Sequence, residues 1–137
     1  MAELACSLDP VTSAPGVAVA VLRGMIDPRN VESLGAAFSR AVAKGFRTIV
    51  VDLRDIRYIT SSGLSFLVNL SDYLGSRGGS LHLANAQPKV KVVFELMAVD
   101  QFFRLHPTVD AALAAIAPTV RPARPRPRPV SSGRRDP

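Results

Sequence analysis

Thr60, Ser61 and Ser62 have the clearest capacity for chemistry, because these three hydroxyls directly precede Gly63 and an apolar pattern of helical spacing. A strand-to-helix turn gathers unpaired backbone N–H groups and the positive end of the helix dipole, which favours an anion. Phosphorylation there would add close to two negative charges and change the surface that a partner meets. Ser and Thr are also common helix caps, so a purely structural turn is the alternative interpretation.

No catalytic or metal-binding pattern is found elsewhere in the sequence. The chain lacks H-E-x-x-H, paired cysteines, glycine-rich phosphate loops and the G-x-S-x-G elbow of a nucleophilic serine. We expect His82 to point outward from a strand and His106 to lie in a surface loop before Pro107. The single cysteine, Cys6, is expected to be a small buried side chain of the first strand. These observations predict a protein that is not an enzyme and that has no metal and no cofactor.

The positive charge of the chain is concentrated at its C-terminal end. Residues 118–137 contain six arginines and one acid, whereas residues 1–117 contain 11 basic and 10 acidic side chains. The end segment also has six prolines and few large apolar residues, too few to offset the entropy of ordering. We expect residues 118–137 to be a disordered Arg/Pro-rich tail and residues 1–117 to form one domain. The tail is interpreted as a solubilising end, with binding to an anionic membrane or nucleic acid as the alternative.

The body of the chain lacks the features of nucleic-acid-binding and membrane proteins. Residues 1–117 show no basic stripe with interleaved aromatic residues, so direct nucleic-acid binding is not expected. No apolar run approaches the roughly 18 residues of a membrane-spanning helix, and the N-terminus has no signal-peptide pattern. We therefore expect a cytoplasmic protein without a membrane span.

Strands and helices alternate along residues 1–117. Strands are predicted at 3–8, 16–22, 48–53, 81–83 and 102–103. Helices are predicted from the cap Asp27 to Gly45, from the hydroxyl turn to Gly75, across Val90 to Met97, and from the cap Thr108. The run 48–53 lacks polar alternation, which is typical of a central strand buried on both faces. The order predicts an α/β fold with a small mixed, mostly parallel sheet of four to five strands covered by about four helices.

The stretch around the turn resembles the signature of the STAS domain of anti-sigma-factor antagonists. That signature has an aspartate-led strand, a Tyr or Phe, an apolar residue and then Asp-Ser-[Ser/Thr]-Gly-Leu. The matching residues here are Asp52, Leu53, Tyr58, Ile59, Ser61, Ser62, Gly63 and Leu64. Gly24-Met25-Ile26-Asp27 resembles the Gly-x-[Leu/Ile]-Asp element before the first helix of that family. In this chain Thr60 stands where the family has the aspartate before the serine.

The resemblance implies a partner switch. An unphosphorylated antagonist of this family binds an anti-sigma factor that is also a serine kinase, frees the sigma factor, and stops binding when phosphorylated. By this resemblance the acceptor is Ser61, ahead of Ser62 and Thr60, a PP2C-type phosphatase is a further partner, and a weak homodimer is one expected state. The partner-binding residues that it implies are Gly24, Asp27, Tyr58, Thr60, Ser61, Ser62, Gly63 and Leu64. The alternative is a STAS subunit of a membrane transporter or of a larger signalling assembly.

Overall fold

The computed structural model describes residues 4–116, which form five strands and four α-helices in alternation. The strands are β1 (Leu4–Pro10), β2 (Val17–Ile26), β3 (Thr48–Ile59), β4 (Ser80–Ala84) and β5 (Arg104–His106). The helices are α1 (Val31–Ala43), α2 (Ser61–Ser76), α3 (Pro88–Leu96) and α4 (Val109–Ile116), and a 3₁₀ turn, η1 (Asp100–Phe102), precedes β5. The predicted tail, residues 118–137, lies outside the described residues.

The five strands form one sheet in the order β1-β2-β3-β4-β5. β1 pairs antiparallel with β2, and the three other pairs are parallel. The prediction of a small, mixed, mostly parallel sheet is therefore confirmed, and so is the central place of the strand that begins at Thr48. Parallel neighbours joined through helices bring their carboxyl ends to one edge of the sheet, which is where ligands and partners meet such folds.

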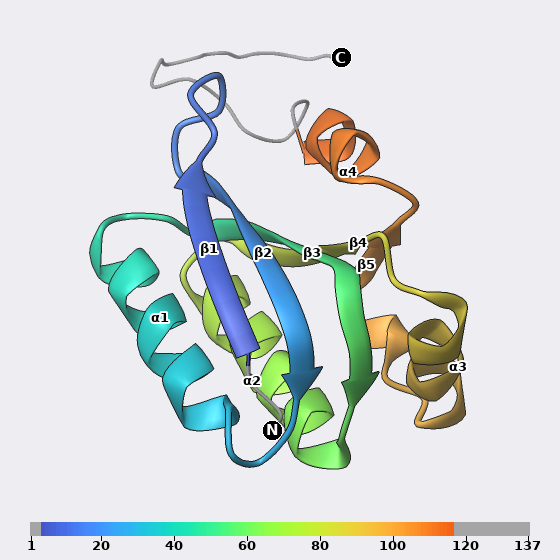
Figure 1. Ribbon diagram of the computed structural model, residues 1–137. Coiled ribbons are helices and arrows are strands. Elements are labelled where there is room, and N and C mark those ends of the chain that lie inside the picture. The colour runs from blue at the N-terminus through green and yellow to red at the C-terminus, as the bar shows by residue number, and fades with distance from the viewer. Residues whose placement is uncertain (1–3, 117–137) are drawn as a thin grey trace.

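Helices cover both faces of the sheet. α1 and α2 lie on one face, and α4 lies across part of the other (Figure 1). Alternate residues of β3 belong to the two apolar clusters on opposite faces of the sheet. Ile49, Val51 and Leu53 face α1 and α2, whereas Val50 packs with Ile116 of α4. This two-sided burial is the physical reason why the first half of β3 has no polar alternation.

Several element boundaries differ from the sequence-based expectation. β2 continues to Ile26 because Gly24, at φ 116°, takes up an irregularity in its pairing with β3, and β3 continues to Ile59. α1 begins at Val31 with Asn30 at its cap position, so Asp27 does not cap that helix. The strand predicted at 102–103 is wrong: η1 ends at Phe102 and the last strand starts at Arg104. The predicted Thr108 cap is confirmed, because its Oγ1 accepts the N–H of Ala111 at 3.0 Å.

Several predicted side-chain environments are also wrong. His82 is buried, at 5% exposure, and its two ring nitrogens contact Ser80 and His106. His106 is the half-buried last residue of β5 and does not lie in a surface loop. Cys6 is exposed, because β1 is the edge strand and a groove between β1 and α1 stays open beside it. The third helix was predicted to reach Met97, yet this residue lies just past the end of α3 and is 52% exposed.

Candidate functional site

The site lies at the carboxyl edge of β2 and β3, where two loops are tied together by hydrogen bonds. The backbone N–H of Thr60 donates to the carbonyl oxygen of Ile26 at 3.0 Å, and the Thr60 hydroxyl donates to the same oxygen at 3.3 Å. On the other side of Ile26, the Asn30 side-chain amide donates to the Met25 carbonyl at 2.7 Å. The segment before α1 and the turn before α2 are therefore joined at this edge of the sheet.

Thr60 is also the N-cap of α2. Its extended backbone, at φ −91° and ψ 171°, turns the Oγ1 atom toward the helix start, where it accepts the Gly63 N–H at 3.2 Å. The first helical hydrogen bond follows from Leu64 N–H to the Thr60 carbonyl at 2.9 Å. One hydroxyl thus satisfies a helix-start donor and fastens the turn to β2.

Gly63 lets α2 approach the ends of β2 and β3 closely. A Cβ at this position would lie 2.6 Å from Cγ2 of Ile26 and 2.8 Å from Cγ1 of Ile59, both of which are buried. Real side chains do not tolerate such distances, so only glycine fits without moving the helix. The close approach sets where the first turn of α2 presents its two serines.

Ser61 and Ser62 are both exposed at the start of α2. Within residues 4–116 neither hydroxyl makes a hydrogen bond to another group, so both remain available to a modifying enzyme. Ser61 also lines a groove with Leu64 and Ser65, three and four residues further along the same helix. Ser61 is therefore the serine whose modification would change both the turn and the groove.

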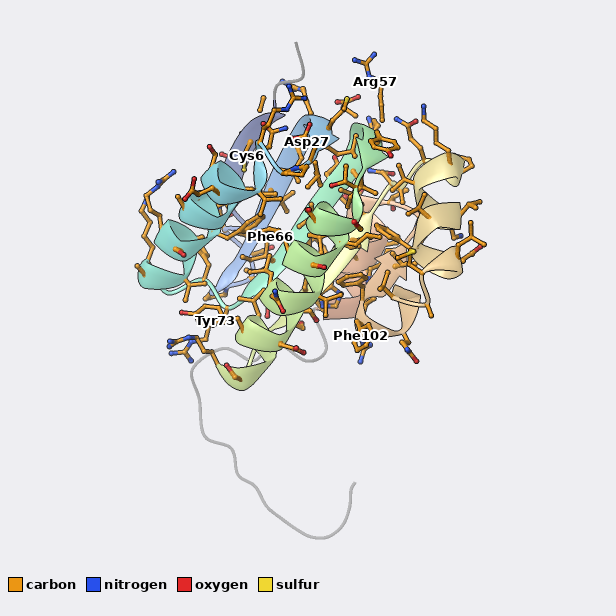
Figure 2. All side chains as sticks on the ribbon, turned by 90° about the horizontal axis from the view of Figure 1, so that it is seen from below. Cys6, Asp27, Arg57, Phe66, Tyr73 and Phe102 are labelled. Carbon is orange, nitrogen blue, oxygen red and sulfur yellow. The ribbon has the colours of Figure 1, made fainter. Side chains whose placement is uncertain are left out.

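Asp27 is buried, at 4% exposure, and each oxygen of its carboxylate accepts a hydrogen bond from Arg29. It accepts the Arg29 backbone N–H at 2.9 Å and a guanidinium N–H at 3.0 Å. These bonds from Arg29 hold the pKa of the Asp27 carboxyl below its usual value, against the opposing effect of burial. Asp27 and Arg57 lie at the same end of the molecule (Figure 2). Asp27 therefore shapes the loop beside the turn rather than presenting a free carboxylate.

The remaining predicted partner-binding residues divide by exposure. Tyr58 is 54% exposed, next to the end of β3, and can touch a partner directly. Gly63 and Leu64 are buried under the turn, and Gly24 lies within β2 opposite Ile56. Gly24 is partly exposed, whereas the buried Gly63 and Leu64 can act on a partner only by setting the backbone around the exposed residues.

Sequence reasoning missed an apolar groove beside Ser61. It is a cavity of about 360 Å³ between α2 and the segment that runs from the end of α3 through η1, and it includes Met97, Val99 and Phe102. Met97 and Phe102 are 52% and 46% exposed. A signal was present in the sequence, because the apolar residues Met97, Val99 and Phe102 follow one another closely just past the end of α3.

The described residues contain no constellation for metal chemistry. Between residues 4 and 116, no group of three or more His, Cys, Asp and Glu side chains is placed to hold a metal ion. In the same part of the chain, no helix has both the length and the apolar character needed to cross a bilayer.

The sheet topology, the two joined loops and the serine-bearing start of α2 define an α/β domain of the STAS type. The chain belongs to the STAS domain family, whose sequence pattern matches residues 10–112. It is 34% identical over 100 residues to BtrV of Bordetella bronchiseptica, described as a candidate anti-sigma factor antagonist, over 73% of this chain and 86% of that protein.

Solved structures agree with this assignment. The crystal structure of an anti-sigma factor antagonist from Mycobacterium paratuberculosis superposes with a TM-score of 0.74 and 27% identity, over 84% of this chain and 95% of that one. The anti-sigma factor antagonist SpoIIAA in its unphosphorylated form gives a TM-score of 0.70 and 25% identity, over 83% and 97%. The predicted family and fold are therefore confirmed.

Proposed function

We propose that this chain is a cytoplasmic anti-sigma-factor antagonist. It binds a cognate anti-sigma factor, which is also a serine kinase, and so frees the sigma factor. Phosphorylation of Ser61 ends the binding, and a PP2C-type phosphatase restores it. The observation that carries the proposal is the exposed Ser61 hydroxyl at the start of α2, on a turn that Thr60 fastens to Ile26.

The likeness to known antagonists supports this function over the transporter alternative. The three relatives compared above are antagonists by name, and this chain spans between 86% and 97% of their lengths. A murine anion transporter also shares the fold, but at 20% identity and over only 22% of its own chain. The related antagonist SpoIIAA is described in its unphosphorylated form, so its phosphorylation state is a defined property. This supports a phosphorylation switch in the present chain. No feature of the described residues favours docking on a permease or a transport ATPase.

The local electrostatics fit a switch that changes the surface and leaves the fold intact. A phosphate on Ser61 would stand at the positive end of the α2 dipole, beside the free N–H groups of the first turn. The N-cap bond comes from Thr60 and not from Ser61, so modification does not remove the cap. The added charge therefore acts on the partner.

The proposal is tested by identifying the partner and the acceptor together. The tagged chain is used to capture its anti-sigma factor from the native host, and the purified kinase is then supplied with ATP. Intact-mass analysis should show one phosphate on the wild type and on Ser62→Ala, and none on Ser61→Ala. Equal labelling of wild type and Ser61→Ala would remove Ser61 as the acceptor.

A further inference from the structure

The groove between α2 and η1 lies beside the turn, and the phosphorylation site alone does not explain it. Ser61, Leu64, Ser65, Val68 and Asn69 of α2 form one wall of its cavity of about 360 Å³. Met97, Val99 and Phe102 form the other wall. Figure 2 shows Phe102 on one side of α2 and Tyr73 on the other, so the groove is separate from the hollow between α1 and α2.

The second wall of the groove is held in place before any partner binds. The Ser71 hydroxyl of α2 donates to the Phe102 carbonyl at 2.9 Å, and the Phe102 N–H donates to the Val99 carbonyl at 3.0 Å. Behind this wall, the rings of Phe94 and Phe103 pack at 5.8 Å between centroids within the core. A preformed groove saves the ordering entropy that a partner would otherwise have to offset.

The chemistry of the groove selects an apolar occupant. No charged side chain lines it, and two of its lining residues, Met97 and Phe102, are 52% and 46% exposed. Leu96, next to Met97 in the chain, is 78% exposed. Exposed Met and aromatic residues in an uncharged hollow match the composition of the centre of a protein interface.

We propose that this groove receives apolar side chains of the anti-sigma factor and forms the centre of the interface. The inference rests on the proposed function, because Ser61 belongs both to the phosphorylated turn and to the wall of the groove. It also explains how one modification ends binding. A partner that covers the groove must also cover Ser61, and a phosphate there would lose its water against uncharged side chains.

The groove is tested by calorimetric titration of the anti-sigma factor with Met97→Ser, Phe102→Ser and the matched control Tyr73→Ser. Tyr73 is likewise exposed, at 43%, but lines the hollow between α1 and α2. Each groove variant should bind at least about tenfold more weakly, and the control within about twofold of wild type. The Phe102 change keeps the backbone oxygen that Ser71 contacts, and a urea titration verifies that each variant is folded.

The outcomes separate this inference from the proposed function. If both groove variants bound with wild-type affinity while Ser61→Asp bound weakly, the groove would not be the centre of the interface, and the antagonist function would still hold. Absence of binding between the wild type and any anti-sigma factor of the host would overturn both. Sedimentation that shows a dimer in the wild type and a monomer in Phe102→Ser would identify a second copy as the occupant and contradict the proposal.

Discussion

Thr60 occupies the position at which this chain departs from the family signature, and its two hydrogen bonds show what the exchange changes. Its hydroxyl accepts from Gly63 N–H and donates to Ile26 O. An aspartate could accept in the same way, but an ionised carboxylate could not donate to the carbonyl. Thr60 therefore keeps the helix cap and adds a hydrogen bond to β2. It also leaves Ser61 without an acidic residue directly before it in the chain.

From this dual role we predict how substitutions at Thr60 change the free energy of unfolding. Thr60→Val keeps the shape and removes the hydroxyl, so the free energy of unfolding should fall by about 1 kcal/mol. Thr60→Ser retains both hydrogen bonds and should change it by less than about 0.5 kcal/mol. Urea unfolding measures both. Equal stability of the valine variant and wild type would show that the cap contributes nothing.

Gly63 gives a second prediction at the residue scale, with Gly75 of the same helix as its control. Gly63→Ala places a Cβ against Ile26 and Ile59 and should cost about 1–3 kcal/mol of unfolding free energy. Gly75→Ala meets no atom within 4 Å and should be neutral or stabilising by up to about 1 kcal/mol. Thermal or urea unfolding of both variants is the measurement, and a neutral Gly63→Ala would contradict the close approach.

The residue types at the turn were predictable from sequence, but their exposure was not. The signature placed Asp27, Gly63 and Leu64 in the site together with Ser61. The structure buries these three and leaves Ser61 exposed, because the Ile26–Thr60 bonds pull the turn onto the sheet. Such burial depends on contacts between segments about thirty residues apart, which local pattern does not report.

At the scale of elements, a pair of histidines joins β4 to β5. Nδ1 of His82 and Nε2 of His106 are 3.0 Å apart, and Nε2 of His82 contacts the Ser80 hydroxyl at 2.8 Å. Burial, followed by the charges of His106 and Arg104, lowers the pKa of His82 from 6.5 to about 4. The pKa of His106 is lowered as well, mainly by burial and then by Arg104.

The histidine pair predicts a pH dependence of stability. Between pH 6.5 and about 4 the unfolded chain binds a proton at His82 and the folded chain does not. The unfolding free energy should therefore be highest above pH 6.5 and fall as the pH drops through that window. His82→Gln keeps a polar side chain and removes this titration, so its profile should be flatter, with the remaining slope from His106. If the unfolding free energy fell with pH equally in wild type and in His82→Gln, the titration of His82 would not be its cause.

The alternation of elements could be predicted, whereas the path after α3 could not. Periodicity alone indicated the buried residues Val90 and Phe94 and therefore the helix. The chain then turns through Ala98 at φ 57°, a left-handed conformation that sequence patterns associate with glycine or asparagine. No such residue marked the turn, so Phe102 and Phe103 were wrongly predicted as a strand and the groove beside η1 was missed.

At the scale of the whole molecule, the buried core of the described residues lies between Val17 and Ile116. We therefore expect removal of residues 118–137 to change the free energy of unfolding by less than about 0.5 kcal/mol. Urea titrations of the full and shortened chains test this, at two salt concentrations because the removed segment carries six arginines. A loss of more than about 1 kcal/mol would show that the segment is part of the folded domain.

The most direct test of the central claim is the affinity of wild type, Ser61→Ala and Ser61→Asp for the cognate anti-sigma factor. Ser61→Asp adds a negative charge at a helix start that favours it, so the variant should be as stable as wild type. We predict that Ser61→Ala binds within about twofold of wild type and that Ser61→Asp binds at least about tenfold more weakly. Wild-type affinity in a folded Ser61→Asp variant would contradict a switch at Ser61.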